Sequence, residues 1–421
     1  MNSLLRDQEL PSHWRSAQLG HVALVSTGSA DVQDAVDNGK YPFFVRSEEV
    51  RTLNRFTHNT EAVLTAGDGN VGDIFHYYQG KFAAHQRVYV IEPGEGLLGK
   101  YLYYAMQNGF KDSLQGTTAK STVESLRRPM LTRFRIPFPP LKDQLVIAEF
   151  LDHETSEIDA FIADQERLIE LLEERRAATI THAVTKGLDP NAPMKDSGTE
   201  WVGNIPASWD MKRISWLFGT ISSGTTPPVQ ISEYFDGEFN WVTTSELRET
   251  SITHTNRTIT RKALREFPSL RLYGPGTLLI AMYGATIGRL GLLETPAATN
   301  QACCAFSEPV GTSSKFVFYV LLAAREHLMM LADGGGQPNI NQDKLRSLRI
   351  PQPDLKTQNE IVDFLDQETS ALDAAVSDAR EAIALSQERR AALISAAVTG
   401  QMDVSQAQRP VDEVLEEEVR V

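Results

Sequence analysis

A stretch of fifty residues occurs twice in this chain. Residues 136–185 and 350–399 align without a gap, 214 positions apart, and 27 of the 50 positions are identical. A duplication of this length means that one supersecondary unit has been used twice. Because the two copies alternate with two segments of similar size, the sequence predicts a tandem of variable domain, helical segment, variable domain and helical segment.

The composition is that of an ordinary globular protein. A chain of 421 residues with 41% hydrophobic content can bury the cores of two or three domains. The only two cysteines, Cys303 and Cys304, are adjacent, which excludes a disulfide framework and is typical of a reducing compartment. The first residues lack the basic start and apolar run of a signal peptide, and no stretch approaches about 18 apolar residues. We therefore expect a cytoplasmic protein that does not cross a membrane.

The net charge of −14 is concentrated in the repeats and the tail. Residues 1–140 and 191–350 each carry a net charge of +1, whereas residues 141–190 carry −7 and residues 351–421 carry −9. The variable domains are thus close to neutral and can carry local basic faces. The acidic balance does not exclude nucleic acid as a ligand of these domains, and it indicates that the helices face a different partner.

Each repeat has the pattern of a long helix. In the first copy the apolar periodicity begins at Leu141, after two prolines that a helix cannot pass through. Ser156 and Ser370 are each followed three residues later by aspartate, which resembles a capping box, so the helices are predicted to restart or kink there. From these points each helix would span roughly 40 Å. Gly187 and Gly400 stand just beyond the helices as C-terminal stops.

The apolar positions of the two helices recur at alternating spacings of four and three, which is the spacing of a coiled-coil seam. The seam comprises Ile158, Ile162, Gln165, Ile169 and Leu172 in the first helix and Leu372, Val376, Ala379, Ile383 and Ser386 in the second. A single helix of this kind would more often pack on its own domain, but two matching helices favour an intramolecular antiparallel pair. The polar and small members of the seam leave room for helices of another protein.

The two variable domains begin alike and then diverge. Leu-Pro-Ser-His-Trp at residues 10–14 corresponds to Ile-Pro-Ala-Ser-Trp at residues 205–209, and a linker rich in glycine, proline and asparagine precedes the second motif. Short strands and glycine-rich turns follow in both domains, and the run at residues 85–87 has its counterpart at residues 300–302. This pattern predicts an α/β scaffold with variable loops, which suits a binding surface.

Motifs of self-contained catalysis are missing from the sequence. Neither the Asn/Asp-Pro-Pro-aromatic motif of an amino-methyltransferase nor a Walker-type phosphate loop occurs. Asp354 and Lys356 form a D-x-K pair of nuclease appearance, but Pro140 takes the place of Asp354 in the first repeat. The nine histidines form no zinc-type pair, and the glycine turns at residues 67–72 and 283–288 are more typical of bends between strands than of phosphate cradles. Any catalysis would therefore belong to partner proteins.

Taken together, these landmarks resemble one family, the DNA-specificity (S) subunits of type I restriction-modification systems. The matching motifs cover about residues 10–400 and comprise IPASW at 205–209 and, more weakly, LPSHW at 10–14, IP-x-P-x-L-x-x-Q at 136–144 and 350–358, FLD-x-ET-S-x-x-D in each repeat, YGATIG at 283–288 and QPNINQ at 337–342. The first domain departs most, because it has GDGNVG in place of YGATIG and TAKST in place of PNINQ.

The resemblance implies an α+β fold with the pseudo-two-fold symmetry of a tandem repeat. Two α/β target-recognition domains would be separated by two long helices that form an antiparallel coiled coil. The implied segments are the first recognition domain at 1–140, the first helical spacer at 141–186, a linker at 187–204, the second recognition domain at 205–350, the second helical spacer at 351–400 and an acidic, disordered tail at 401–421.

The resemblance also implies a function. The chain would be a non-catalytic specificity subunit that reads a bipartite double-stranded DNA sequence, one half-site per recognition domain, with the helices setting the unread spacer. It would bind two methyltransferase (M) subunits and, with restriction (R) subunits, form a complex with adenine-N6 methyltransferase and ATP-dependent nuclease activities. S-adenosylmethionine, ATP and Mg²⁺ would be bound by those partners and not by this chain.

Loop side chains that can hydrogen-bond to base edges or phosphates are the candidate DNA contacts. In the first domain they are Arg46, Ser47, Arg51, Asn54, Arg55, Asn70, His85, Gln86, Arg87 and Lys120. In the second domain they are Ser222, Ser223, Thr225, Thr243, Thr244, Ser245, Arg248, Asn256, Arg257, Tyr283, Thr286, Asn300, Gln301, Gln337, Asn339, Asn341 and Lys344. They cluster in the turn-rich stretches between the scaffold landmarks.

Two other classes of function remain open from the sequence. A scaffold that binds ligands other than DNA, through two domains on a helical spacer, would have the same acidic helices, and only the recognition-domain motifs argue against it. A self-contained methyltransferase or nuclease is the third hypothesis. The bases that are read do not follow from the sequence, because readout depends on loop geometry and on DNA shape.

Overall fold

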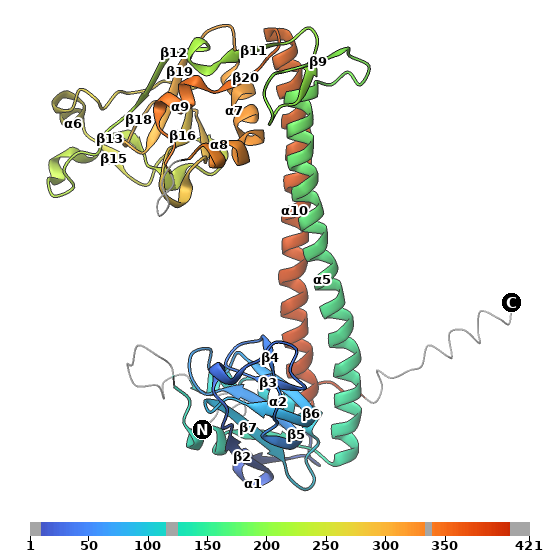
Figure 1. The fold of residues 1–421 in the computed structure, drawn as a ribbon. Coiled ribbons are helices and arrows are strands. Elements are labelled where there is room, and N and C mark those ends of the chain that lie inside the picture. Colours follow the sequence, from blue (N-terminus) through green and yellow to red (C-terminus); the bar gives the residue numbers. More distant parts are fainter. Residues whose placement is uncertain (1–9, 115–124, 333–338, 405–421) are drawn as a thin grey trace. The chain divides into compact units, whose positions relative to one another are not determined.

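The structure is a computed structural model that describes residues 10–114, 125–332 and 339–404 (Figure 1). Its contacts divide the chain into two compact units. Unit 1 consists of Met1–Glu166 together with Arg380–Val421, and unit 2 is Arg167–Ala379. Each unit therefore contains one variable domain and a part of each long helix.

The core of unit 1 is a six-stranded sheet in the order β2-β7-β5-β6-β3-β4, in which only the pair of β3 and β6 is parallel. The strands are β2 (Ala23–Thr27), β3 (Tyr41–Phe44), β4 (Val50–Leu53), β5 (His58–Ala66), β6 (Phe75–Ala84) and β7 (Val88–Pro93). The helices are α1 (Leu19–Val22), α2 (Gly99–Gln107), α3 (Phe110–Leu114) and α4 (Arg128–Thr132). Residues 62–66 of the central strand β5 are all buried, as expected of a strand covered on both faces.

Unit 2 divides a related scaffold between two sheets, a five-stranded one in the order β12-β19-β16-β17-β14 and a three-stranded one in the order β15-β13-β18. The strands are β12 (Phe218–Ser223), β13 (Phe235–Val242), β14 (Thr250–Ile252), β15 (Thr258–Ile259), β16 (Leu278–Ala281), β17 (Leu290–Leu293), β18 (Ala297–Thr299) and β19 (Cys303–Pro309). The helices of this domain are α6 (Arg261–Glu266), α7 (Ser314–Ala323), α8 (Arg325–Leu331) and α9 (Gln342–Ser347).

The two domains share one plan at their bases. In each, an antiparallel pair of short strands brings the chain in and out of the domain. The pairs are β1 (Arg15–Gln18) with β8 (Arg135–Phe138), and β11 (Asp210–Arg213) with β20 (Arg349–Gln352). Because the second strand of each pair leads directly into a long helix, each domain is joined to its helix at the same point.

A glycine marks a second shared point of the two domains. Gly28 follows β2 and Gly224 follows β12, and each lies against a backbone carbonyl of another strand. A Cβ at these positions would stand 2.0 Å from the oxygen of Ala84 and 1.7 Å from that of Thr299. Only glycine fits so close an approach. Both domains therefore keep this residue, although their sequences otherwise differ.

The repeats form two long helices, α5 (Leu141–Lys186) and α10 (Leu355–Val398), which are continuous over 46 and 44 residues. The predicted C-terminal stops are confirmed. Gly187 and Gly400 follow the two helices with φ values of 76° and 73°, in the left-handed region that glycine adopts most readily.

The predicted restart at Ser156 and Ser370 is wrong, because both helices run unbroken through these positions, and a kink there stays a prediction. The neighbouring threonines show how the helix continues. Thr155 and Thr369 each donate a side-chain hydrogen bond of 2.6 Å to the carbonyl four residues earlier in the same helix. Polar side chains of this kind can satisfy themselves within a helix as well as at its start, so the capping pattern alone did not specify a break.

The two long helices are antiparallel within unit 1. Leu151 of α5 and Ile394 of α10 belong to the same apolar core. Further along α5, Asp159 accepts hydrogen bonds from Arg390, with Nε at 2.8 Å and Nη2 at 3.2 Å. A higher residue number in one helix thus corresponds to a lower number in the other, as an antiparallel pair requires.

The same direction holds in unit 2. Arg176 Nε lies 2.8 Å from Asp373 Oδ1, and further along α5 Ile180 shares a core with Leu365 of α10. The predicted fold class is thus confirmed, with two α/β domains and two long helices that pair in antiparallel fashion. Along these helices the predicted seam positions are the buried or half-buried ones, whereas the positions between them are mostly exposed.

The end of α10 closes the core of unit 1. Ala397 and Val398 are completely buried among residues of the first variable domain. The Tyr101 hydroxyl donates to the Val398 carbonyl at 3.3 Å, across 297 positions of sequence. A Cβ on Gly400 would lie 3.1 Å from the ring of Trp14. The first domain therefore depends on the last described helix for part of its core.

The end of α5 has the same role in unit 2. Val184 is completely buried in the core of the second variable domain, and a Cβ on Gly187 would lie 3.2 Å from the ring of Trp209. Part of the predicted linker that follows is ordered as a two-stranded sheet, formed by β9 (Met194–Asp196) and β10 (Asn204–Pro206). Each tryptophan of the two shared N-terminal motifs thus packs against a helix end.

Candidate nucleic-acid interface

A buried glutamine near the start of each long helix fixes its variable domain in place. Gln144 accepts a hydrogen bond from the Leu98 N–H at 2.8 Å and donates to the Pro139 carbonyl at 2.8 Å. Gln358 accepts from the Ser313 N–H at 2.8 Å and donates to a proline carbonyl in the same way. Both glutamines are completely buried. Because Leu98 and Ser313 precede α2 and α7, each glutamine orients a helix of its domain.

An aspartate two turns further along each long helix makes a second connection. Asp152 accepts from Lys100 Nζ at 2.6 Å and from the Tyr104 hydroxyl at 2.7 Å. The same contacts recur in unit 2 at 2.5 and 2.7 Å, among Asp366, Lys315 and Tyr319. Burial and the Asp366 hydrogen bond raise the pKa of Tyr319 to about 12, so this phenol stays a donor. The loops at the far ends of the strands are therefore carried on a fixed platform.

Two arginines of unit 1 meet on one carboxylate. Arg46, just after β3, places Nη1 2.7 Å from Asp68 Oδ1, and Arg87, just before β7, places Nη1 2.6 Å from Asp68 Oδ2. The Asp68 side chain is 11% exposed, whereas the arginines are 43% and 62% exposed. Burial pushes the pKa of Asp68 up, but hydrogen bonds from Arg46 and Arg87 more than offset it and hold the pKa below its ordinary value. The carboxylate therefore stays ionised and holds both cations.

The turn between β6 and β7 has the same construction as its counterpart in unit 2. His85 Nδ1 accepts from the Arg87 N–H at 3.0 Å, and Asn300 Oδ1 accepts from the Ala302 N–H at 3.0 Å. His85 is only 4% exposed, and burial lowers its pKa, so the ring stays neutral. In this structure His85 shapes the turn that presents Arg87, and its ring is not open to a ligand.

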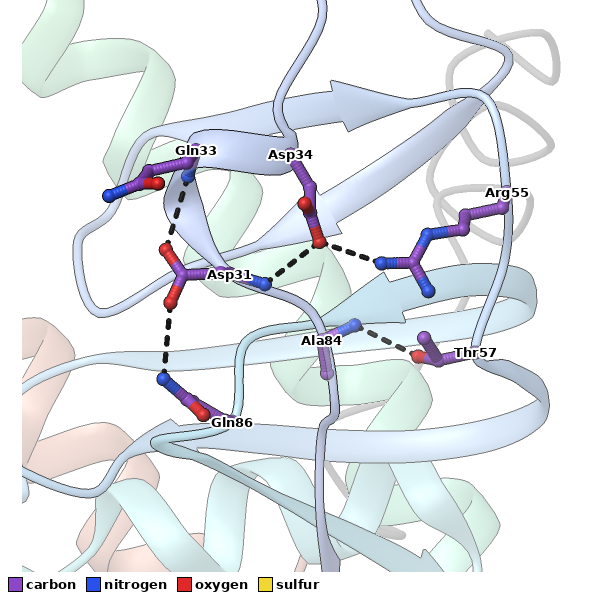
Figure 2. Close-up of polar contacts among 7 residues, drawn as sticks. All are labelled: Asp31, Gln33, Asp34, Arg55, Thr57, Ala84 and Gln86. Carbon is purple, nitrogen blue, oxygen red and sulfur yellow. Dashed lines mark hydrogen bonds and ion pairs between the residues drawn. The ribbon is translucent and has the colours of Figure 1, made fainter.

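Further candidates of unit 1 are held by a short acidic turn (Figure 2). Gln86 Nε2 donates to Asp31 Oδ2 at 3.2 Å, and Arg55 Nη2 lies 2.6 Å from Asp34 Oδ2. The Asp31 N–H also donates to the Asp34 carboxylate, and this bond together with that from Arg55 lowers the pKa of Asp34. Residues from three loops are thus joined by hydrogen bonds at this edge of the domain.

The other candidates of unit 1 lie less close together. Arg51 is half-buried in β4 and Asn54 is exposed in the turn after it, whereas Asn70 is exposed in the glycine turn beside Asp68. The Ser47 hydroxyl bonds to a backbone carbonyl two residues on. Lys120 in this domain and Gln337 in the second domain lie outside the described residues.

One group of candidates in unit 2 gathers at the corresponding edge. The Tyr283 hydroxyl donates to the Gln301 carbonyl at 2.7 Å, and the backbone of Tyr283 pairs with that of Asn339. The Gln301 side chain accepts from the Thr226 hydroxyl. Further candidates beside them are Ser222, bonded to the Tyr273 hydroxyl at 2.8 Å, Ser223, bonded to Gln342 at 2.8 Å, Thr225, whose carbonyl accepts from Trp241, and Asn300 in the turn described above.

A second group lies beyond the end of β13. Glu246 accepts from the Thr243 N–H at 3.0 Å and from the Asn256 N–H at 2.6 Å, which joins two loops. Arg257 stacks on aromatic rings, with its guanidinium carbon 4.5 Å from the Phe235 centroid. The remaining candidates of this group are Thr244 and Ser245, which form a short 3-10 turn, and Arg248, which donates to the Ser245 carbonyl at 3.3 Å.

Two candidates of unit 2 support the scaffold itself, and a third lies in a turn. Asn341 Oδ1 accepts from the Lys344 N–H at 2.9 Å and so caps α9. Lys344 Nζ donates to the Leu331 carbonyl at 2.6 Å. Thr286 is half-buried in the 3-10 turn after Tyr283. The cap uses only Oδ1 of Asn341, so the two N–H groups on Nδ2 take no part in it.

The sequence reasoning missed the carboxylates of this surface. Asp31, Asp34, Asp68 and Glu246 each hold a candidate side chain or loop, but only donors suited to DNA were selected from the sequence. Asp68 lies inside the glycine turn GDG, so its position in a tight loop was visible. What it holds was not, because Arg46 and Arg87 are distant in sequence and meet only in the fold. Within the described residues, no group of three or more His, Cys, Asp or Glu side chains could hold a metal ion.

The sequence of this chain matches a known protein family. A family model described as "Type I restriction modification DNA specificity domain" matches residues 11–171 and again residues 206–378. The chain belongs to this family. Its two matches begin at the two tryptophan motifs and each extends into a long helix, so the family domain comprises a variable domain together with much of the repeat.

Similar curated proteins include specificity subunits of type I restriction enzymes. That of EcoDI from Escherichia coli is 34% identical over 178 residues, which cover 42% of this chain and 39% of that protein. That of MjaIX from Methanocaldococcus jannaschii is 31% identical, over 39% of this chain and 38% of that protein. These matches thus span well under half of either relative, whereas MjaVIII from the same archaeon aligns at 24% identity over 85% of this chain and 86% of its own length.

Solved structures share the fold. A chain from a study of complex assembly and conformational transition of the type I R-M system superposes with a TM-score of 0.69 at 16% identity, covering 94% of this chain and all of that one. The HsdS subunit from Thermoanaerobacter tengcongensis gives a TM-score of 0.51 at 16% identity, covering 94% of this chain and 99% of that one.

Among the described helices, none is long and apolar enough to span a membrane.

Proposed function

We propose that this chain reads a bipartite double-stranded DNA sequence, one half-site per unit, as the specificity subunit of a type I restriction-modification complex. One observation carries the proposal. Both domains present the same turn at the same edge, built around His85 in unit 1 and Asn300 in unit 2, with different hydrogen-bonding side chains around it. A fixed scaffold with exchangeable donors is what base-edge readout requires.

Membership of the family supports partners for this chain. Two methyltransferase subunits and the restriction subunits would bind to it, and the complex would methylate adenine at N6. S-adenosylmethionine, ATP and Mg²⁺ would be bound by those partners. The strongly acidic repeats, with mostly exposed positions outside the seam, provide surface for such subunits. Its site of action would be the cytoplasm, where both of its buried cysteines remain free thiols.

The long helices would set the distance between the half-sites. Both helices run unbroken from one unit into the other. Half-sites about one turn of DNA apart, roughly 35 Å, would let both domains read one face of the duplex. The helices themselves would then lie over bases that are not read.

The test is to co-express the chain with its methyltransferase subunit and to map modified adenines in the host DNA. A bipartite motif with an unread spacer is expected, and gel shifts with duplexes of this motif should show binding that random duplexes do not compete for. A scaffold for other ligands would leave DNA unmodified and unbound. Modification by the chain alone would mean that it is itself an enzyme.

Modularity provides a second test. Residues 214–348 lie between β11 and β20, so their exchange for the corresponding segment of a relative leaves this strand pair and both long helices intact. One half of the mapped motif should change while the other half stays the same. A change in both halves, or in neither, would contradict the assignment of one half-site to each domain.

A further inference from the structure

The backbone contacts of the two domains identify which positions correspond. The Gly67 N–H donates to the Arg87 carbonyl at 2.8 Å, and the Met282 N–H donates to the Ala302 carbonyl at 2.9 Å. Arg87 therefore corresponds to Ala302. The next residue, just beyond the end of β5 in one domain and of β16 in the other, is Asp68 or Tyr283, and each forms an isolated antiparallel bridge to a segment downstream.

The third position follows from a second pair of contacts. The His85 N–H donates to the Phe44 carbonyl at 2.9 Å, and the Asn300 N–H donates to the Val242 carbonyl at 3.0 Å. Two residues further on stand Arg46 in unit 1 and Thr244 in unit 2. The cluster of two arginines and one aspartate in unit 1 thus corresponds to Thr244, Tyr283 and Ala302, none of which is charged.

Asp68 orients both arginines of this cluster but occupies only part of their hydrogen-bonding capacity. Each contacts Asp68 through Nη1, and among the described residues the edge formed by Nε and Nη2 makes no hydrogen bond, so it can make two parallel ones to a ligand. Fixing the guanidinium in advance removes part of the side-chain entropy that an arginine would otherwise lose on binding. Asp68 itself is too deeply placed to reach a ligand, with 11% of its side chain exposed.

The charge of the cluster also favours DNA. Two guanidinium groups and one carboxylate give the cluster itself a net charge of +1, and the neighbouring Asp31, Asp34 and Arg55 add one further negative charge at this edge. His85, which packs beside the cluster, is buried and accepts a hydrogen bond at Nδ1, so it adds no acceptor for the arginines. Two parallel donors in a plane match the O6 and N7 acceptors that guanine presents in the major groove, and arginine is the side chain that most often makes this contact.

We propose that Arg46 and Arg87, held by Asp68, read guanine in the half-site taken by unit 1, whereas unit 2 reads its half-site without a cation at the three corresponding positions. This inference rests on the proposed function, and it makes the two half-sites chemically unlike. Arg46 and Arg87 would contact base edges, and Asp68 would act as a positioning residue that touches only the arginines.

The experiment uses the complex of the full chain with its methyltransferase subunits and a duplex of the mapped motif. Each guanine is replaced in turn by 7-deazaguanine, which lacks the N7 acceptor but pairs normally. At one or two guanines of the half-site taken by unit 1, the replacement should weaken binding about tenfold. In the Arg46→Ala and Arg87→Ala variants, 7-deazaguanine at the guanine read by the missing arginine should weaken binding little further, because that contact is already lost.

Asp68→Asn tests the positioning role, because asparagine has the same shape but binds the arginines more weakly. Its discrimination between guanine and 7-deazaguanine should fall several-fold, while its affinity for random duplex is kept or raised by the lost negative charge. Asp73→Asn, in an exposed pair with Lys111 at 2.6 Å, is the matched control and should discriminate as the wild type does.

Failure of this inference is distinguishable from failure of the proposed function. If no guanine responds to 7-deazaguanine, or if the arginine variants lose affinity equally for every sequence, the arginines are not base readers, and a bipartite motif still supports the proposed function. If no bipartite motif is modified or bound at all, the proposed function itself is wrong. The inference would also be overturned if the guanines whose response is lost in Arg46→Ala and Arg87→Ala lay in the half-site that changes when residues 214–348 are exchanged.

Discussion

Asp159 and Arg390 pair across the two long helices, with Arg390 Nε 2.8 Å from Asp159 Oδ1, and the same two repeat positions meet again as Asp373 and Arg176. Each aspartate lies 214 residues from the other, and so does each arginine. The aspartate of one repeat therefore always meets the arginine of the other repeat. A duplicated helix that pairs with its own copy in antiparallel register produces this result without further design.

Reversal of one of these pairs should test the register. Asp159→Arg places two arginines together and should lower the free energy of unfolding by up to about 1 kcal/mol, since both groups are partly exposed and screened. Adding Arg390→Asp restores opposite charges and should recover most of the loss, as measured by urea denaturation. If the double variant is no more stable than Asp159→Arg alone, the two side chains do not pair in solution.

Replacing a buried glutamine should loosen a variable domain from its helix. Gln358→Leu leaves the Ser313 N–H without its acceptor in a buried position, which costs about 1–3 kcal/mol of stability. Urea denaturation of the full chain measures this loss. Gln401→Leu, at an exposed position after α10, should change stability by less than about 0.5 kcal/mol. Equal stability of the two variants would mean that the buried contacts of Gln358 contribute little.

His85→Asn should preserve the turn of unit 1, because Asn300 builds the same turn in unit 2. The substitution should also change the pH dependence. Burial holds the pKa of His85 below its ordinary value of 6.5, so the unfolded chain takes up a proton first as the pH falls. This contribution to stability is complete above about pH 6.5 and declines below it. Thermal melting between pH 5 and 8 should show a smaller decline for His85→Asn, and an unchanged decline would assign it to other groups.

Asn341 can be tested for DNA contact separately from its role in capping. Asn341→Ala removes the cap of α9 and should cost about 1 kcal/mol of stability, whereas Asn341→Ser keeps a capping oxygen and should cost much less. If the amide of Asn341 contacts a base, both variants should lose about 1–3 kcal/mol of binding to one half-site. Gel shifts decide the point, and unchanged sequence preference in Asn341→Ser would remove Asn341 from the set of contacts.

The spacer between the half-sites should lengthen when both helices do. Insertion of seven helical residues after Glu166 and seven after Ala379 keeps the seam in phase and adds about 10 Å. This corresponds to roughly three base pairs at 3.4 Å each. An insertion in α5 alone, after Thr185, is less suitable, because it would displace the contact of Gly187 with Trp209. Mapping of modified adenines should show both half-sites unchanged and farther apart, and a constant spacer would mean that the helices do not set the distance.

Much of the architecture could be predicted because the repeat is long and its pattern is local. The positions of the seam, the glycine stops and the direction of pairing all follow from periodicity within one copy and from the presence of a second copy. The correspondence of residues 85–87 with residues 300–302 was also visible, although its cause was not. The ring nitrogen of His85 and the amide oxygen of Asn300 accept the same hydrogen bond, which a comparison of residue types does not reveal.

What could not be predicted depends on contacts between distant segments. The pairing of Arg46 and Arg87 on Asp68 joins three loops, and no local pattern indicates it. The unbroken path of α5 through Ser156 reflects packing along the whole helix, which outweighs a local capping signal. Which helix end packs into which variable domain could not be predicted either, because the two repeats are nearly alike at their ends.

The contact of Tyr101 with Val398 has a consequence during synthesis of the chain. The ribosome makes the first variable domain early, but the helix end that fills its core follows 297 positions later. At about 5–20 residues per second, this is a delay of roughly 15–60 seconds. The second variable domain has no such delay, because the end of α5 is made before it. The domain that is translated first is therefore completed after the second one, and its apolar surface stays uncovered until the end of α10 has been made.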